Sequence, residues 1–291
     1  MPWYDVLLIL ASVVVTVYIF INFERLIYQP PIASPVQMIL GCICLVVLLE
    51  AARRMVGPTI PCIALFFLFY ALFSNHFPGF LESRGYPLSR ILADVYLSEV
   101  GVFGGALQVV IRVVFVFIAF GVGLQVTGGT KLFVDLALAM FGKVTGGPAK
   151  VAVVASGMMG MISGSPLANA ATVGVITIPM MKNAGYRPVF AAAVEAVAST
   201  GGVLMPPVMG VTAFLMAEFL RIPYVSVCIA AALPAILYYW AAFVMIHVEA
   251  VKTGLRGLPP EQLPSITKTL KEGWQFFLPL IALVYFLAVL A

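Results

Sequence analysis

Long apolar runs separated by short polar connections dominate this chain. A helical run must cross a hydrocarbon core of about 30 Å to span a membrane, which takes about 20 residues. The runs that reach or nearly reach this length are residues 5 to 22, 35 to 50, 58 to 74, 107 to 127 and 225 to 247, together with a last run that begins at Trp274. The pattern predicts an all-α polytopic membrane protein.

Two segments between these runs are more polar. Residues 75 to 99 contain several charges and separate the third run from the fourth. Residues 131 to 141 (KLFVDLALAMF) mix apolar positions with Lys131 and Asp135. The mixture predicts a short amphipathic helix that lies at the membrane interface.

Residues 150 to 220 are apolar throughout but are broken at two places by small and helix-breaking residues. The first break is Ser163-Gly164-Ser165-Pro166, and the second is Ser199-Thr200-Gly201-Gly202, followed closely by Met205-Pro206-Pro207. Each piece between the breaks is too short to cross a bilayer alone. The predicted arms are residues 150 to 162 and 167 to 181 around the first break, and residues 188 to 198 and 208 to 220 around the second.

The positions of lysine and arginine predict the topology, because these residues gather on the cytoplasmic side of a membrane. Arg53 and Arg54 follow the second run, which places the N-terminus inside as well. Lys150 precedes the first broken segment and Lys182 follows it. To keep both inside, the first segment must enter and return as a re-entrant hairpin, and the second must cross once as a broken helix.

The composition supports a membrane protein and excludes several other classes. Hydrophobic residues make up 63% of the chain, charged residues 10%, and the mean hydropathy is +1.10. The net charge of +4 comes from scattered residues, so a nucleic-acid surface is excluded. The four cysteines form no CxxC pair, and His76 and His247 have no partner at metal-ligand spacing. No constellation of an intramembrane enzyme is present, so we expect neither an enzyme nor an organic cofactor.

Two breaks at membrane depth indicate a binding site. Broken helices expose backbone groups that cost several kcal/mol unless protein, water or a ligand pairs them. Transporters use helix N-termini for a substrate carboxylate and freed carbonyls for Na⁺. Close packing and kinks are the alternative use of such residues. The small polar residues around the breaks are Ser163, Ser165, Asn169, Thr172, Ser199 and Thr200.

Single charged residues in this region have two interpretations each. Glu195 lies one turn before the second break, and an intramembrane carboxylate is either functional or a structural partner within the bundle. We place it among the candidate substrate contacts, which are Ser165, Asn169, Thr172 and Glu195. Glu218 and Arg221 are three residues apart near a helix end, and this spacing predicts an interfacial ion pair.

Residues 146 to 219, with their SGSP and STGG/MPP motifs, resemble the large membrane subunit of TRAP transporters. The similarity extends to GLPPEQLPS at 257 to 265 and EGW at 272 to 274. The chain resembles in particular the fused permeases that work with TAXI-type periplasmic binding proteins. The resemblance implies an elevator-type importer of small carboxylates in the bacterial or archaeal inner membrane, driven by sodium as the coupling ion. It implies sodium ligands, many of them backbone carbonyls, at Ser163, Gly164, Ser165, Asn169, Thr200, Gly201, Gly202 and Met205.

The resemblance also suggests how the chain is divided. Residues 1–55 would correspond to part of the small membrane subunit, 56–145 to scaffold spans and the interfacial helix, 146–223 to the hairpin and broken helix, and 224–291 to the spans that follow. Because the family has two inverted repeats and this chain shows one hairpin and one broken helix, we expect one repeat half and a last span cut short.

Two other functions remain open on the sequence alone. A divalent-anion symporter that needs no binding protein would share the hairpin architecture. A membrane scaffold subunit would use the breaks for packing only. A co-encoded secreted binding protein would separate the first alternative from a tripartite importer, and loss of transport with intact assembly would exclude the second.

Overall fold

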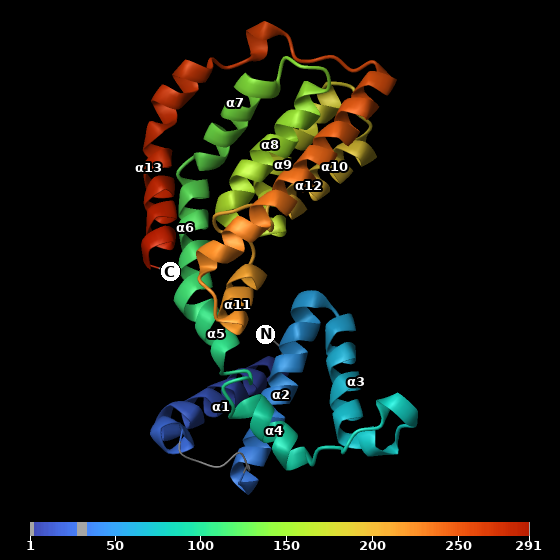
Figure 1. Ribbon diagram of the computed structural model, residues 1–291, viewed down its shortest axis with the longest axis vertical. Coiled ribbons are helices and arrows are strands. Elements are labelled where there is room, and N and C mark those ends of the chain that lie inside the picture. The colour runs from blue at the N-terminus through green and yellow to red at the C-terminus, as the bar shows by residue number, and fades with distance from the viewer. Residues whose placement is uncertain (1–2, 28–33, 291) are drawn as a thin grey trace. The chain divides into compact units, whose positions relative to one another are not determined.

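A computed structural model gives the fold for residues 3–27 and 34–290. All regular elements in these residues are helices, which confirms the all-α class (Figure 1). The chain forms two compact units, Met1–Gln108 and Val109–Ala291.

Six helical segments among the described residues are long and apolar enough to cross a membrane. Each corresponds to one of the predicted runs: Trp3–Leu26, Pro35–Val56, Thr59–His76, Gly105–Val126, Tyr224–Thr253 and Ile266–Leu287. The apolar runs therefore locate the candidate spans correctly.

In the first unit, α2 (Pro35–Val56) packs against α1 (Trp3–Ile27), α3 (Thr59–Phe73) and α4 (Leu88–Tyr96). Two short 3₁₀ turns, Ser74–His76 and Gly79–Leu81, connect α3 to α4. The helix α4 lies inside the stretch whose polar residues gave no helix signal, and it buries Ile91, Leu92, Ala93 and Tyr96. The Tyr96 hydroxyl donates a hydrogen bond of 2.9 Å to the Val15 carbonyl oxygen and so joins α4 to α1.

A continuous helical path made of α5 (Gly105–Val109), the π-helical segment η3 (Val110–Val114) and α6 (Phe115–Val126) leads into the second unit, which begins at Val109. The helix α7 (Gly129–Phe141) follows at the place predicted for an amphipathic helix. It packs against α8 and α13, and it buries Leu132, Phe133, Val134, Leu136 and Ala137. Its location at a membrane interface stays a prediction.

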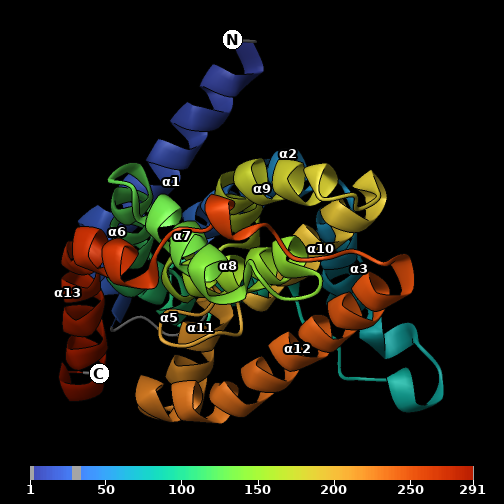
Figure 2. The same cartoon turned by 90° about the horizontal axis from the view of Figure 1, so that it is seen from above.

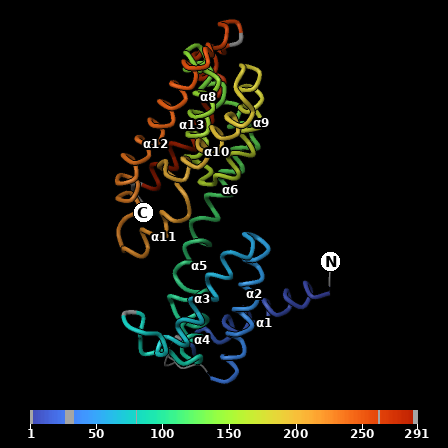
Figure 3. Tube along the Cα trace, turned by 90° about the vertical axis from the view of Figure 1, so that its right-hand side faces the viewer, coloured from blue at the N-terminus to red at the C-terminus, as the bar shows by residue number. Residues whose placement is uncertain are grey.

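The core of the second unit is a bundle of α8 (Gly147–Ser163), α9 (Pro166–Asn183) and α10 (Pro188–Gly201), each in contact with the other two (Figure 3). The long helix α12 (Tyr224–Thr253) packs on α8 and α10 (Figure 2). The short helix α11 (Val211–Leu220) lies between α10 and α12 in sequence. A connection with one 3₁₀ turn, Pro260–Gln262, leads to α13 (Ile266–Leu290), which packs on α7 and α12.

Candidate functional site

The first break separates α8 from α9 and has the local geometry that its residues dictate. Gly164 ends α8 with φ 57°, a left-handed conformation that glycine adopts without a steric penalty. Ser165 is the N-cap of α9, where its hydroxyl accepts a hydrogen bond of 3.3 Å from the Ala168 amide. Pro166 then occupies the first helical position, where no amide hydrogen is needed. The two helical arms predicted around the first break are therefore present, and their return to one side of the membrane stays a prediction.

The second break runs from Gly202 to Gly210, between α10 and α11. The Gly210 amide donates to the Val203 carbonyl oxygen at 2.9 Å, which closes the loop on itself. The Tyr224 hydroxyl of α12 donates to the carbonyl oxygens of Pro207 and Val208, at 3.0 and 2.5 Å. These contacts hold the loop against the start of α12.

The two breaks touch each other. The Val208 amide of the second break donates to the Met161 carbonyl oxygen near the end of α8 at 3.3 Å. A Cβ added to Gly164 would overlap the Met209 carbonyl oxygen, and one added to Gly160 would overlap the Gly202 backbone. Glycines at both contacts therefore allow the hairpin tip and the loop to pack backbone against backbone.

The carbonyl groups at the second break are already engaged. The carbonyl oxygens of Thr200, Gly201 and Gly202 accept turn hydrogen bonds from the amides three residues later, at 3.2, 3.0 and 3.3 Å. Hydroxyls from α12 reach the carbonyls just before them: Tyr238 donates to Val197 at 2.8 Å and Tyr239 donates to Ala198 at 3.0 Å. A carbonyl oxygen has a second lone pair, so each can still accept one more contact.

The hairpin, in contrast, holds oxygen atoms that no described donor reaches. Asn169 is fully buried, and its Nδ2 donates to the Ser156 carbonyl oxygen at 2.8 Å, but its Oδ1 has no hydrogen-bond partner. The buried Ser163 Oγ also has none. Within the described residues, no hydrogen bond ends on the Gly164 carbonyl oxygen. Because buried polar atoms are normally paired with protein, water or a ligand, the Asn169 and Ser163 oxygens are candidate ligand contacts.

Glu195 lies at the centre of a second polar cluster, which joins the three bundle helices. Its side chain is 1% exposed, and its carboxylate accepts hydrogen bonds from three hydroxyls. The donors are Ser156 of α8 at 2.8 Å, Thr177 of α9 at 2.5 Å and Ser199 of α10 at 3.0 Å. Ser156 belongs to both clusters, since its carbonyl oxygen accepts from Asn169. No basic residue pairs with Glu195 in the described ion pairs.

The comparison with known families decides what this bundle belongs to. The family described as "Tripartite ATP-independent periplasmic transporter, DctM component" matches residues 43–291. The chain belongs to the DctM family. No curated protein matches the chain. The resemblance to a TRAP permease is thus confirmed, and the chain is a membrane permease component of a TRAP-type transporter.

The DctM fold brings some of the expected site residues together and leaves others apart. Asn169 and Glu195 are linked through Ser156, and Gly164 contacts the second break. The Thr200 side chain is exposed and its hydroxyl donates to Ala196 of its own helix at 2.7 Å. The Thr172 hydroxyl likewise donates to Ala168 at 2.8 Å. Each of these two hydroxyls therefore donates its hydrogen bond within its own helix. Met205, in the loop of the second break, is half-buried.

Nothing in the sequence singles out the residues that complete the two clusters. Ser156 and Thr177 are isolated hydroxyls within apolar arms, and Tyr238 and Tyr239 lie in an apolar span. Their roles depend on which helix faces packing brings together. One property of the sequence could have indicated these contacts. A hydroxyl in an apolar helix needs a hydrogen-bond acceptor, and a buried carboxylate in the next helix is a strong one.

Proposed function

We propose that this DctM permease belongs to a sodium-driven importer of small carboxylates, which receives its substrate from a periplasmic TAXI-type binding protein. The permease function itself follows from the family. The TRAP system further pairs such a permease with a small membrane component and a periplasmic binding protein. The proposal therefore adds the coupling ion, the substrate class and the type of binding protein.

The observation that carries the sodium proposal is the set of open oxygens on the hairpin. Asn169 Oδ1, Ser163 Oγ and the Gly164 carbonyl oxygen are neutral acceptors without a described donor. Neutral oxygens suit a hard monovalent cation, and broken helices in transporters coordinate Na⁺ in this way. Ser165, Thr200, Gly201, Gly202 and Met205 complete the proposed ligand set, where the second lone pairs of engaged carbonyls at the second break would contribute.

We place the substrate carboxylate at the start of α9, around Ser165, Asn169 and Thr172. The positive end of a helix dipole favours an anion there. Glu195 is only 1% exposed, so it can contact a substrate only if the bundle helices separate. Its three hydroxyl partners support a role in holding α8, α9 and α10 together.

Uptake into vesicles tests the proposal. The transporter that contains this chain, with its small membrane component, is reconstituted and supplied with labelled carboxylate. We expect uptake only when an inward sodium gradient and the binding protein are both present. Uptake without the binding protein would instead favour a symporter of the divalent-anion type, and absence of transport under every condition would favour a scaffold.

The orientation of the hairpin gives a separate prediction. The re-entrant topology places the exposed Asn183, at the end of α9, on the cytoplasmic side with Lys182. We expect Asn183→Cys to react with a membrane-impermeant maleimide only after the membrane has been permeabilised. Labelling of intact cells from the periplasm would mean that α8 and α9 do not return to the side they entered.

A further inference from the structure

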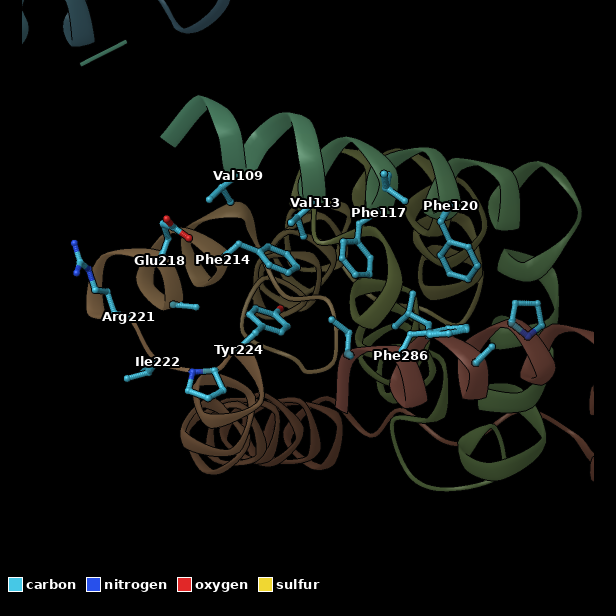
Figure 4. A pocket seen from close by; sticks show the side chains of 17 residues that line it. Val109, Val113, Phe117, Phe120, Phe214, Glu218, Arg221, Ile222, Tyr224 and Phe286 are labelled. Atoms are coloured by element: carbon cyan, nitrogen blue, oxygen red, sulfur yellow. The ribbon is translucent and has the colours of Figure 1, made fainter. Parts of the chain in front are cut away.

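The second unit has a large apolar groove, whose lining includes none of the residues that form the Asn169 and Glu195 clusters. Its volume is about 1170 Å³, and the stretch from α5 to α6, together with α11, the start of α12 and α13, forms its walls. This volume is above the range of about 300 to 1,000 Å³ for ordinary small-molecule sites. Phe117, Phe120, Phe214 and Phe286 project into it from three helices (Figure 4). A small carboxylate would gain nothing from such walls, so the groove suits an apolar ligand.

One end of the groove differs from the rest because it carries two opposite charges. Glu218 and Arg221 lie together at this end, beyond the aromatic rings (Figure 4). Both side chains are exposed. Among the ion pairs of the described residues, none joins Glu218 to Arg221, so the ion pair predicted from their spacing is wrong. The physical reason is that Arg221 leaves the helix with φ 52°, which turns its side chain out of the helical register.

The groove has the length of one membrane leaflet. On the α5-to-α6 wall, the lining residues run from Val109 to Phe120, which are eleven steps apart along the helix, or about 16 Å at 1.5 Å per residue. Half of a hydrocarbon core of about 30 Å is about 15 Å. A single acyl chain can therefore lie along the wall while its headgroup remains at the charged end.

We propose that this groove binds one aminophospholipid, of the phosphatidylethanolamine type, with an acyl chain against the phenylalanines. The guanidinium of Arg221 would bind the lipid phosphate, because arginine forms charge-assisted hydrogen bonds with phosphate oxygens. The carboxylate of Glu218 would accept from the lipid ammonium, which carries three N–H donors. An anionic lipid without an amine would bind less tightly, because it has no positive charge to pair with the Glu218 carboxylate. A phosphatidylcholine headgroup would also bind less tightly, because its quaternary ammonium has no N–H group to donate to that carboxylate.

Lipid binding to the purified, delipidated transporter tests this assignment. Phosphatidylethanolamine, phosphatidylcholine and phosphatidylglycerol with the same acyl chains are added, and the bound lipid is counted by native mass spectrometry. We expect one phosphatidylethanolamine per chain, bound about tenfold more tightly than either other lipid, as one lost charge-assisted contact implies. Equal binding of the three lipids, or no lipid bound because a protein segment fills the groove, would overturn the proposal.

Variants separate the headgroup contacts from the acyl groove. Arg221→Gln should weaken phosphatidylethanolamine binding about tenfold, and Glu218→Leu, which removes the acceptor, should remove the preference over phosphatidylcholine. Ala217→Phe, which adds a ring inside the groove, should abolish binding of all three lipids. Arg256→Gln, an exposed arginine outside the groove, is the matched control and should bind as the wild type does. A retained amine preference in Glu218→Leu would refute the headgroup assignment even if Ala217→Phe fails to fold.

Discussion

Replacing Gly164 by alanine is expected to reduce substrate uptake more than about tenfold, the change that a loss of 1.4 kcal/mol produces. The added Cβ would overlap the Met209 carbonyl oxygen, and the left-handed φ of 57° disfavours any residue with a Cβ. The hairpin tip must then move away from the second break. Initial uptake rates at equal amounts of inserted protein measure the effect.

Gly123→Ala is the matched control for this change. Gly123 lies in α6, and a Cβ added there meets no atom within 4 Å. In a helix interior, alanine is also more favourable than glycine by about 1 kcal/mol. Uptake by Gly123→Ala should equal that of the wild type. Normal uptake by Gly164→Ala would show that the close contact between the two breaks is not required for transport.

The second large effect concerns stability. We expect Glu195→Ala to lower the free energy of unfolding by about 2 to 4 kcal/mol, because three buried hydroxyls lose their acceptor and a cavity forms. The loss stays below the sum of three unpaired donors, since Thr177 can donate to the Val173 carbonyl oxygen, now at 3.1 Å. Unfolding in mixed micelles by titration with a denaturing detergent measures this change.

Two further variants complete that test. Glu195→Gln keeps one side-chain oxygen as an acceptor, so it should lose less stability than Glu195→Ala. Glu261→Ala removes an exposed carboxylate and should change stability by less than about 0.5 kcal/mol. Equal stability of Glu195→Ala and wild type would mean that the three-hydroxyl cluster does not hold α8, α9 and α10 together.

The arrangement of helices and breaks could be predicted from the sequence because each depends on local properties. Run length and hydropathy locate the candidate spans, and the two breaks follow from glycine, serine and proline at fixed places. Gly164 and Pro166 show this clearly, since a left-handed C-cap and a first-turn proline leave few conformations for the chain between two helices.

The partners of the site residues could not be predicted, because they depend on packing between helices. Nothing in the sequence indicates that Ser156 and Thr177 face Glu195 or that Tyr239 reaches the end of α10. The freed carbonyls expected from Thr200 to Gly202 instead accept turn hydrogen bonds, because the chain continues in tight turns after α10 ends. The helix α4 was missed for a similar reason, since its apolar face is short and surrounded by polar residues.

The sodium dependence of uptake by an Asn169 variant tests the central claim most directly. If Asn169 Oδ1 binds the coupling ion, Asn169→Leu should raise the half-saturating sodium concentration about tenfold. Thr212→Val, at an exposed position of α11, should behave as the wild type does. An unchanged half-saturating sodium concentration in Asn169→Leu would contradict the account, as would wild-type uptake that follows a pH gradient without sodium and disappears in Glu195→Gln.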